Sequence, residues 1–562
     1  MTALDWFVLI GTLAFIAIYG AWKSRDVRTV DDYMRGGNTL HWPTIGLSIM
    51  ATQASAITFL STPGQAYEDG MRFVQFYFGL PLAMIVIAAV FVPIYHRLKV
   101  YTAYEYLEHR FDHRVRYLGA VLFLIQRGLA AGITIYAPSI ILSTLMGWPL
   151  HLTNVAMGLF VVAYTVSGGT RAVSHTQKQQ MIVMLGGMAL AGVVIAYNLP
   201  ESVSLPSAVK LAGALGRMNV VSFDLDFSNR YNFWSGITGG FFLALAYFGT
   251  DQSQVQRYLA GRSVGEIRLG LLFNGLFKIP MQFGILFIGV LVFVFYLFNA
   301  PPLFFNKPTL DLVAQTTHAA ELQSLEQRFG EAFTLQKDAA SAYVATLRSG
   351  QGEDAAKLAL QDAFKQTQAL RQEAKALVAD ALPGKETKDT DYVFISFVLK
   401  YLPHGLVGLL IAVILCAAMS STSSELAALG STSMIDLYKR LGSGSAATVE
   451  TSASDLRISK LFTVLWGFAA VAFATFASLV DNLIQAVNIL GSIFYGTLLG
   501  LFVVAFFLRR VTATPVLVAA LIAQAAVIVL FFSSDLGFLW FNVVGCGIVV
   551  VLSSVFEAMR RR

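Results

Sequence analysis

The chain contains few cysteines, histidines and charged side chains for its length. Its 562 residues include two cysteines and eight histidines, and only 13% of the residues are Asp, Glu, Lys or Arg. Cys416 and Cys546 lie within apolar runs, so they indicate neither a disulfide framework nor a metal cluster. The low share of charged residues excludes an ordinary soluble protein of this size.

Apolar residues dominate the sequence. They make up 56% of the chain, and the mean hydropathy is +0.63, which indicates a protein that crosses a membrane many times. The net charge of +6 comes from basic residues clustered between apolar runs, the pattern of cytoplasmic loops rather than of a nucleic-acid site. His175 and His404 are isolated, and no motif joins them into a catalytic centre. We therefore expect a membrane protein that is not an enzyme.

About thirteen apolar runs are long enough to cross a bilayer, at roughly 20 residues per helix. We predict an all-α integral membrane protein with spans near residues 5–22, 43–66, 73–95, 117–146, 150–167, 178–198, 232–259, 269–298, 394–422, 457–478, 482–508, 512–532 and 536–557. The first run has Asp5 before it and Lys23 and Arg25 after it, the reverse of the charge order of a signal peptide. We expect it to remain in the protein.

The orientation follows from the short basic connections. If the spans alternate, the Lys and Arg clusters all fall on one side, which the positive-inside rule assigns to the cytoplasm. This places the N-terminus outside and the C-terminus inside, in the inner (plasma) membrane of the cell. These clusters lie within residues 23–35, 97–116, 171–178, 257–268, 439–460, 509–510 and 560–562.

One segment, residues 301–392, departs from the apolar pattern. It is rich in Ala, Gln, Glu, Leu and Lys, and it predicts two amphipathic helices near 308–348 and 353–381, joined at SGQGED. By alternation the segment lies outside the cell. Two interpretations remain open: a helical hairpin that caps the extracellular surface, or a surface that binds a partner.

The ninth span passes from an apolar run into a cluster of hydroxyl groups. In a helix, Ala417, Ser420, Ser421 and Ser424 share one face. Two serine hydroxyls beside a loosened carbonyl could replace much of the hydration shell of a sodium ion. Alternatively, small and hydroxylated residues simply hold helices together in membrane bundles. This stretch alone does not separate a sodium half-site from such packing.

The second span is unusually polar. It carries Thr52, Gln53, Ser55 and Thr58 within an apolar frame that ends at the Pro63-Gly64 pair. Such a helix is easily interrupted, and interrupted helices in transporters expose carbonyls to ions and substrate. A continuous polar helix packed inside the bundle is the other interpretation. We count Gln53 among the candidate substrate-binding residues.

Two cations lie near the middle of predicted spans. Arg127 in the fourth span and Lys278 in the eighth are each about ten residues from an end, or roughly 15 Å into the membrane. Charges at this depth are costly unless they face water or a partner, so both are functional candidates. Packing against buried carbonyls is the alternative. If they face the substrate, they favour an anionic or zwitterionic solute. Asp251, at the end of the seventh span, indicates a polar cytoplasmic mouth.

Five fragments, taken in order, resemble the sodium/solute symporter family, whose members carry sugars, proline, sialic acid, pantothenate and related solutes. The resemblance covers nearly the whole chain, although shorter members lack the extracellular hairpin. The fragments are YMRGG, TAYEYLEHRF, SGGTRAV, GTDQSQVQRYL and MSSTSSELAALGSTSMIDLYKR.

The resemblance implies an inverted-repeat fold in which two five-helix units surround a site at the membrane midplane, and the first core helix is broken. The implied organisation is an N-terminal peripheral helix and cytoplasmic loop (1–42), the first core repeat and the start of the second (43–300), the insert (301–392), the remainder of the second repeat (393–508) and C-terminal peripheral helices (509–562).

The resemblance also implies site residues. The sodium site consists of the carbonyls of Ala51, Ala54 and Ala417 with the hydroxyls of Ser420 and Ser421. The candidate substrate-binding or gate residues that it adds are Thr58, Tyr77, Tyr247, Lys278 and Gln485: Tyr247 matches the aromatic inner gate of the sugar carriers, and Lys278 and Gln485 match positions near their substrate. Thr58 and Tyr77 stand where the sugar carriers use more polar groups, which weakens a sugar assignment.

A second cation site is altered in this sequence. Members that bind a second sodium have an aspartate where this chain has Gln177, followed by Lys178. Ser423 and Ser424 retain the hydroxyl partners. Without a carboxylate, a second cation loses its counter-charge, so we expect one sodium per cycle.

We therefore expect sodium-coupled symport of a small organic solute by alternating access, with Na+ as the only metal ion and the monomer as the functional unit. The expected partners are the solute and the lipid bilayer, without nucleic acid. A proton-coupled symporter of the same fold is the alternative, supported by Lys178, and a transporter-like sensor is a more distant one. The sequence does not name the solute.

Overall fold

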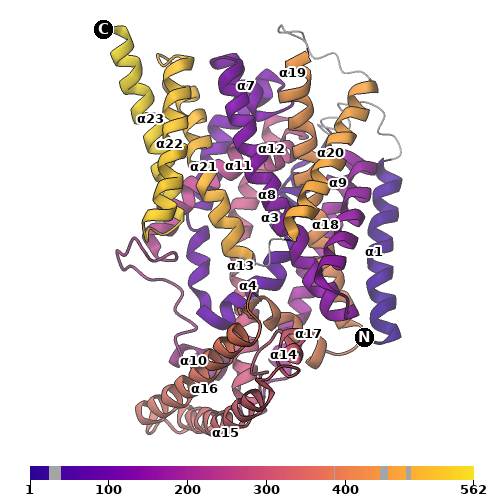
Figure 1. Cartoon of the computed structure of the whole chain (residues 1–562), viewed down its shortest axis with the longest axis vertical. Helices are drawn as coiled ribbons and strands as arrows, with labels where there is room; N and C mark the ends of the chain where they lie inside the picture. The colour runs from indigo at the N-terminus through magenta and orange to yellow at the C-terminus, as the bar shows by residue number, and fades with distance from the viewer. Residues whose placement is uncertain (25–38, 385–386, 443–452, 476–482) are drawn as a thin grey trace.

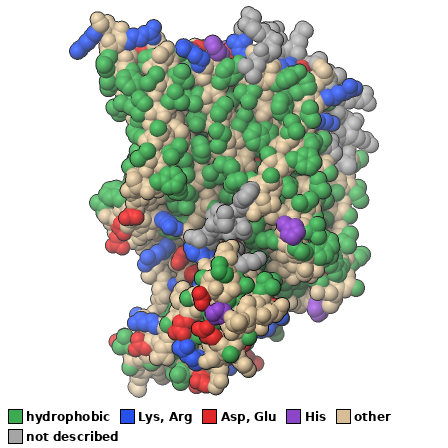
Figure 2. Space-filling model, in the orientation of Figure 1, with side chains coloured by type: hydrophobic (Ala, Val, Ile, Leu, Met, Phe, Trp, Pro, Cys, Tyr) green, Lys and Arg blue, Asp and Glu red, His purple; other side chains and the backbone are tan. Residues whose placement is uncertain are grey.

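The computed structural model describes residues 1–24, 39–384, 387–442, 453–475 and 483–562, and within these ranges the regular elements are helices, with one isolated bridge between Leu40 and Gly261. Long helices stand side by side, with the N-terminus at the hairpin end of the bundle and the C-terminus at the other (Figure 1). Figure 2 shows hydrophobic side chains over the bundle, basic ones at the C-terminal rim, and charges of both signs on the hairpin.

Within the described ranges, ten helical stretches are long and apolar enough to cross a membrane. The all-helical membrane class is thus confirmed. The first half of the chain forms α1 (Ala3–Ser24), α3 (Trp42–Gln53), α4 (Ala56–Asp69), η2 (Gly70–Tyr77), α5 (Leu80–Val86), η3 (Ile87–Phe91), α6 (Val92–Leu98), α7 (Ala103–Arg110), α8 (His113–Met146), α9 (Leu150–Tyr197), α10 (Leu205–Ala214), η4 (Ser235–Gly239), α11 (Gly240–Thr250), α12 (Gln252–Leu259) and α13 (Val264–Phe298).

The second half begins with the insert and returns to the bundle. It forms α14 (Lys307–Val313), α15 (Ala319–Ser349), α16 (Glu353–Ala381), η5 (Thr390–Tyr392), α17 (Val393–Tyr401), α18 (Leu406–Thr432), η6 (Ser433–Tyr438), α19 (Lys439–Gly442), α20 (Ala453–Ala474), α21 (Leu483–Phe507), α22 (Ala513–Ser533) and α23 (Leu539–Arg561).

The chain reverses within α9, although its backbone is helical throughout. The hydroxyls of Tyr164 and Thr176 lie 2.5 Å apart, whereas twelve residues of straight helix would separate them by roughly 18 Å. The two predicted spans 150–167 and 178–198 therefore correspond to two arms of this element on either side of a sharp bend.

Two helices of the bundle are interrupted. Between α3 and α4, Ala54 and Ser55 leave the helical conformation, with ψ angles of 77° and 173°. Pro63 and Gly64 lie inside α4, so this pair does not end the helix. The interruption lies beside Ala51 and Ala54, the segment whose carbonyls the family resemblance implied to be free. The second interruption, between α11 and α12 at Asp251 (ψ 120°), was not predicted.

The predicted ninth span, 394–422, has the wrong bounds. The structure divides it into α17 and α18 at residues 402–405, because Pro403 disfavours helix at Leu402 and Gly405 adopts a positive φ of 89°. The long helix α18 then continues ten residues beyond the predicted end, to Thr432. It is the most enclosed of the candidate spans, with 89% of its apolar window buried.

The predicted hairpin is present as α15 and α16, joined through Gly350 and Gly352, both in the left-handed conformation. The predicted start at residue 308 is wrong, since the first part is a separate short helix, α14. The hairpin is tied to the end of α4: Arg371 contacts Asp389 at 2.9 Å, and Lys375 contacts Glu68 and Asp389 at 3.4 Å each. Burial lowers the pKa of Arg371, but Asp389, Tyr67 and Glu68 together outweigh burial and raise the pKa above its usual value, so the group stays charged.

Close backbone contacts fix α4 inside the bundle. A Cβ added to Gly289 of α13 would lie 2.2 Å from the carbonyl oxygen of Pro63, and one added to Gly64 would lie 2.1 Å from that of Thr390. Glycine is therefore required where α13 and η5 meet α4. These contacts hold α4 directly against α13 and η5.

Candidate functional site

The interruption between α3 and α4 frees a carbonyl oxygen. In a continuous helix, the N–H of Ser55 would donate to the carbonyl of Ala51, but here it donates to Gln53 at 3.1 Å. The Ala51 carbonyl accepts instead from the hydroxyl of Ser420 on α18, at 2.8 Å. The interrupted segment and the serine cluster, 369 residues apart in sequence, therefore meet in the bilayer.

The candidate sodium ligands gather at this point. Ser420 and Ser421 are each 1% exposed, and the Ser421 hydroxyl donates to the Ala417 carbonyl at 2.9 Å. Ala54 lies at the break itself, buried, with its backbone outside the helical conformation. The donor set of carbonyl and hydroxyl oxygens fits a sodium ion, since unwound carbonyls coordinate Na+ in transporters with interrupted helices.

The candidate second cation site is built around an amide. The Gln177 Nε2 group lies 3.0 Å from the Thr52 hydroxyl, 2.9 Å from the Ser424 hydroxyl and 3.1 Å from the Ser420 carbonyl oxygen. Its Oε1 accepts a short hydrogen bond from Ser48. The amide thus donates toward the oxygens that would otherwise face a cation. Ser423, the third residue predicted for this site, instead donates to the Ser420 carbonyl at 3.2 Å.

A cavity of about 90 Å³ opens beside the interruption. Its walls come from the α3–α4 break, η2, α8, α11, α18 and α21. Six predicted residues line it, namely Gln53, Thr58, Tyr77, Arg127, Tyr247 and Ser421, together with residues that were not predicted, among them Glu425, Asn488 and Tyr495. The mixture of aromatic and polar side chains on its walls suits a small organic solute.

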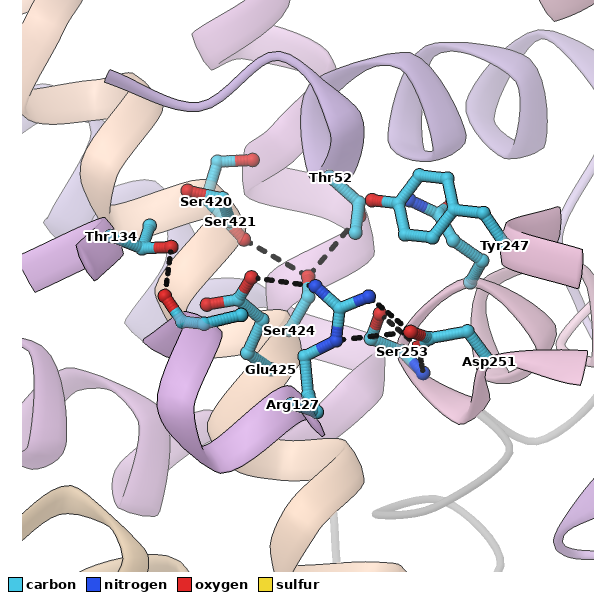
Figure 3. Close-up of polar contacts among 12 residues, drawn as sticks. Thr52, Arg127, Thr134, Tyr247, Asp251, Ser253, Ser420, Ser421, Ser424 and Glu425 are labelled. Carbon is cyan, nitrogen blue, oxygen red and sulfur yellow. Dashed lines mark hydrogen bonds and ion pairs between the residues drawn. The ribbon is translucent and has the colours of Figure 1, made fainter. Parts of the chain in front are cut away.

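Arg127 forms an ion cluster at the wall of this cavity (Figure 3). Its Nε donates to Asp251 at 3.0 Å, and its Nη1 donates to Glu425 at 3.0 Å. Its Nη2 makes short hydrogen bonds with Asp251 and Tyr495, and its guanidinium lies 5.3 Å from the centre of the Tyr247 ring. The guanidinium is already paired with the carboxylates of Asp251 and Glu425, so its positive charge is not free to pair with an anionic solute.

The second interruption supplies Asp251 to this cluster. The extended backbone at Asp251 leaves the Gly249 and Thr250 carbonyls outside the helical pattern, and they accept from Tyr95 at 2.8 Å and from Tyr104 at 2.9 Å. Asp251 Oδ1 accepts from both the N–H and the hydroxyl of Ser253, at 2.9 and 2.6 Å. Asp251, for which the sequence suggested a polar mouth, is therefore a buried ion-pair partner.

Two predicted substrate residues lie outside the cavity. Lys278 is fully buried, and its ammonium, 5.4 Å from the centre of the Tyr77 ring, has no hydrogen-bond partner among the residues described. Gln485 accepts from Arg230 at 2.5 Å and lines a separate opening on the hairpin side. The structure thus does not bring these two residues to the same cavity as Arg127.

Glu425 and Tyr495 are the residues that the sequence reasoning missed. A signal was present for Glu425, because it lies four residues after Ser421 on the same helical face, although the predicted span ended at residue 422. Nothing in the sequence singled out Tyr495, whose hydroxyl donates to Asp251 at 2.7 Å.

The similarity to known proteins extends over most of the chain. A family model described as the sodium:solute symporter family matches residues 33–324 and 368–523, leaving out the middle of the hairpin. The chain is 36% identical to the human sodium/iodide cotransporter over 273 residues, which are 48% of this chain and 41% of that protein. It is 35% identical to human sodium-coupled monocarboxylate transporter 1, over 48% of this chain and 44% of that one.

The matched segments thus span less than half the length of these human relatives. A longer match is found with the sodium/sialic acid symporter SiaT of Proteus mirabilis, 25% identical over 98% of this chain and 94% of that one. A solved structure of a substrate-bound, outward-open, Na+-coupled sialic acid symporter has a TM-score of 0.76 and 23% identity, covering 99% and 98% of the two chains. This structural likeness establishes the fold, and the family model matches well over half of the sequence. The chain belongs to the sodium:solute symporter family.

Proposed function

We propose that the protein is a sodium-coupled symporter that carries a small organic solute into the cell by alternating access. The observation that carries this proposal is the contact between Ser420 and the Ala51 carbonyl at the interruption of α3 and α4. It joins oxygens of two helices at the edge of the cavity beside the interruption. Ala51, Ala54, Ala417, Ser420 and Ser421 are the proposed sodium ligands.

The two interruptions support an inverted five-plus-five repeat. One lies in the first helix of the proposed first unit (α3–α4), and the other in the first helix of the second (α11–α12). Gln53, Thr58, Tyr77, Arg127 and Tyr247 are the proposed substrate-binding or gate residues.

Sodium binding would order the α3–α4 break and complete the cavity wall. One positive charge that moves into the cell releases about 2.3 kcal/mol of free energy per 100 mV of membrane potential. This free energy can sustain a ratio of inside to outside solute concentration of about fifty-fold. We propose one sodium per cycle because Gln177 fills the second position with a neutral amide. We also propose the monomer as functional unit, in the inner (plasma) membrane, with the N-terminus and hairpin outside and the C-terminus in the cytoplasm.

Uptake in cells that express the protein tests this proposal. Labelled sugars, amino acids and carboxylates are offered at constant pH in NaCl or in choline chloride, and we expect uptake of at least one solute only with sodium. Uptake that persists in choline and follows an imposed pH gradient would establish the proton-coupled alternative instead.

A serine variant locates the sodium site. Ser421→Ala removes a proposed sodium ligand. The sodium concentration for half-maximal uptake should therefore rise about tenfold or more, which corresponds to the loss of one interaction between a polar group and a charged one. Ser431→Ala is the matched control, since Ser431 is also buried on α18 and donates only to the Ala428 carbonyl of its own helix, at 3.0 Å. An unchanged sodium requirement in Ser421→Ala would contradict the assignment.

A further inference from the structure

Glu425 presents an unused carboxylate oxygen at the wall of the central cavity. It lies one helical turn after Ser421 on α18 and is 6% exposed. Its Oε1 accepts from Arg127 at 3.0 Å, but within the described part of the chain its Oε2 is buried without a hydrogen-bond partner. The hydroxyl of Thr134, which also lines the cavity, donates to its own helix at Ala130, at 3.0 Å.

The charges of the ion cluster do not cancel. Arg127 supplies one positive charge, and Asp251 and Glu425 supply two negative ones. Both Asp251 oxygens have donors, from Ser253 on one side and from Arg127 and Tyr495 on the other. Four of the five guanidinium N–H groups are engaged. The remaining unsatisfied charge therefore sits on Glu425 Oε2.

A second acceptor faces the same space. Gln53 lines the cavity at the α3–α4 break, and its Oε1 is buried without a donor among the described residues. A buried acceptor that stays unpaired has lost its hydrogen bonds to water without replacement, and the cost is larger if it is charged. Two such oxygens on one cavity indicate that the bound solute supplies the donors.

We propose that Glu425 recognises a positively charged hydrogen-bond donor on the solute, so that the carrier takes solutes with an ammonium group, such as zwitterionic amino acids, in preference to simple anions. The inference rests on the proposed function and narrows it. An ammonium group satisfies Glu425 Oε2 and cancels the excess charge. A simple anion leaves that oxygen unpaired and meets a guanidinium with a single free N–H.

Matched triplets of compounds test this inference on the purified full chain. Each triplet keeps one carbon skeleton and changes the group at one carbon from ammonium to hydroxyl to hydrogen, as in L-alanine, L-lactate and propionate, with longer skeletons to match the cavity. Thermal unfolding in saturating NaCl reports binding of each compound. For the skeleton that fits, we expect the ammonium member to bind at least about tenfold more tightly than the other two.

The variant Glu425→Gln keeps an oxygen for Arg127 but removes the negative charge. It should abolish the preference within the triplet while leaving the stabilisation by sodium alone in place, which also shows that the variant is folded. Glu108→Gln is the control, because Glu108 also pairs with arginines, Arg116 at 2.7 Å and Arg440 at 2.5 Å, and is not among the cavity residues.

Three results separate the possible failures. If the wild-type protein responds to sodium but binds propionate-type anions as tightly as their ammonium counterparts, the inference is overturned and the proposed function stands. If Glu425→Gln loses its response to sodium, Glu425 holds a metal ion rather than the solute, which also overturns the inference. If the wild type shows no sodium response at all, the proposed function itself fails.

Discussion

Gln177→Glu is the sharpest perturbation of the sodium stoichiometry. The substitution keeps the length of the side chain and places a carboxylate oxygen where Nε2 now lies 3.1 Å from the Ser420 carbonyl oxygen. The nearby hydroxyls cannot compensate, because Thr52 donates to Ser48 and Ser424 donates to Ser420, both at 2.9 Å. The other oxygen of the new carboxylate keeps the hydrogen bond from Ser48, but a buried carboxylate without an ionic partner costs about 3–5 kcal/mol.

A sodium ion would relieve this cost. It would contact the new carboxylate, the Ser420 carbonyl and the two hydroxyls, all of which already surround Nε2. Each bound ion adds about 1.4 kcal/mol of stability per tenfold rise in sodium above its dissociation constant. We therefore expect about 1.4 kcal/mol per decade for the wild type and up to about 2.8 for Gln177→Glu.

The assay is unfolding of the purified protein along a series from choline chloride to NaCl at fixed ionic strength. Gln75→Glu is the control, because Gln75 is also fully buried and its Nε2 also donates to a carbonyl, that of Tyr231, at 2.9 Å. Its stability should fall without recovery in sodium. Equal sodium slopes for the wild type and Gln177→Glu, or a wild-type slope that already corresponds to two ions, would refute the reasoning.

Two further predictions concern stability. Arg127→Met leaves the carboxylates of Asp251 and Glu425 without their ionic partner, and it should lower the unfolding free energy by about 3–5 kcal/mol. A melting temperature equal to that of the wild type would show that the cluster is not buried as described. Gly64→Ala pushes a methyl group to 2.1 Å from the Thr390 carbonyl oxygen and should cost at least about 1–3 kcal/mol, whereas Gly330→Ala, with open space around it, should be neutral or stabilising in the same unfolding assay.

Local chemistry made part of this site predictable. The hydroxyl cluster after Met419 and the polar second span identified the two segments that meet at Ser420 and Ala51. Both patterns are short-range, because a helix places residues three and four apart on one face. The polarity of the second span did not by itself fix the position of the break, and α4 continues through Pro63. The family resemblance implied free carbonyls at Ala51 and Ala54, and the break lies beside them.

Long-range pairing could not be read from one sequence. Arg127 and Glu425 are 298 residues apart, and either could have paired with a carbonyl, with water or with solute. The break at Asp251 is hidden for a related reason: the released carbonyls are satisfied by Tyr95 and Tyr104 from distant parts of the chain. Lys278 was predicted as a substrate-binding residue partly from its depth in the span. It is not among the residues that line the cavity, because depth does not determine which side of a helix a side chain faces.

The hairpin of α15 and α16 is connected by an ion pair to α4, the helix that follows the first interruption. α15 contains 31 residues, so it is roughly 46 Å long. Arg371 and Lys375 of α16 pair with Asp389, which precedes η5, and Lys375 also pairs with Glu68 at the end of α4. With the hairpin outside the cell, as proposed above, an antibody fragment bound to the hairpin would restrain α4 from outside. Such a blocker would need neither to cross the bilayer nor to compete with the cargo.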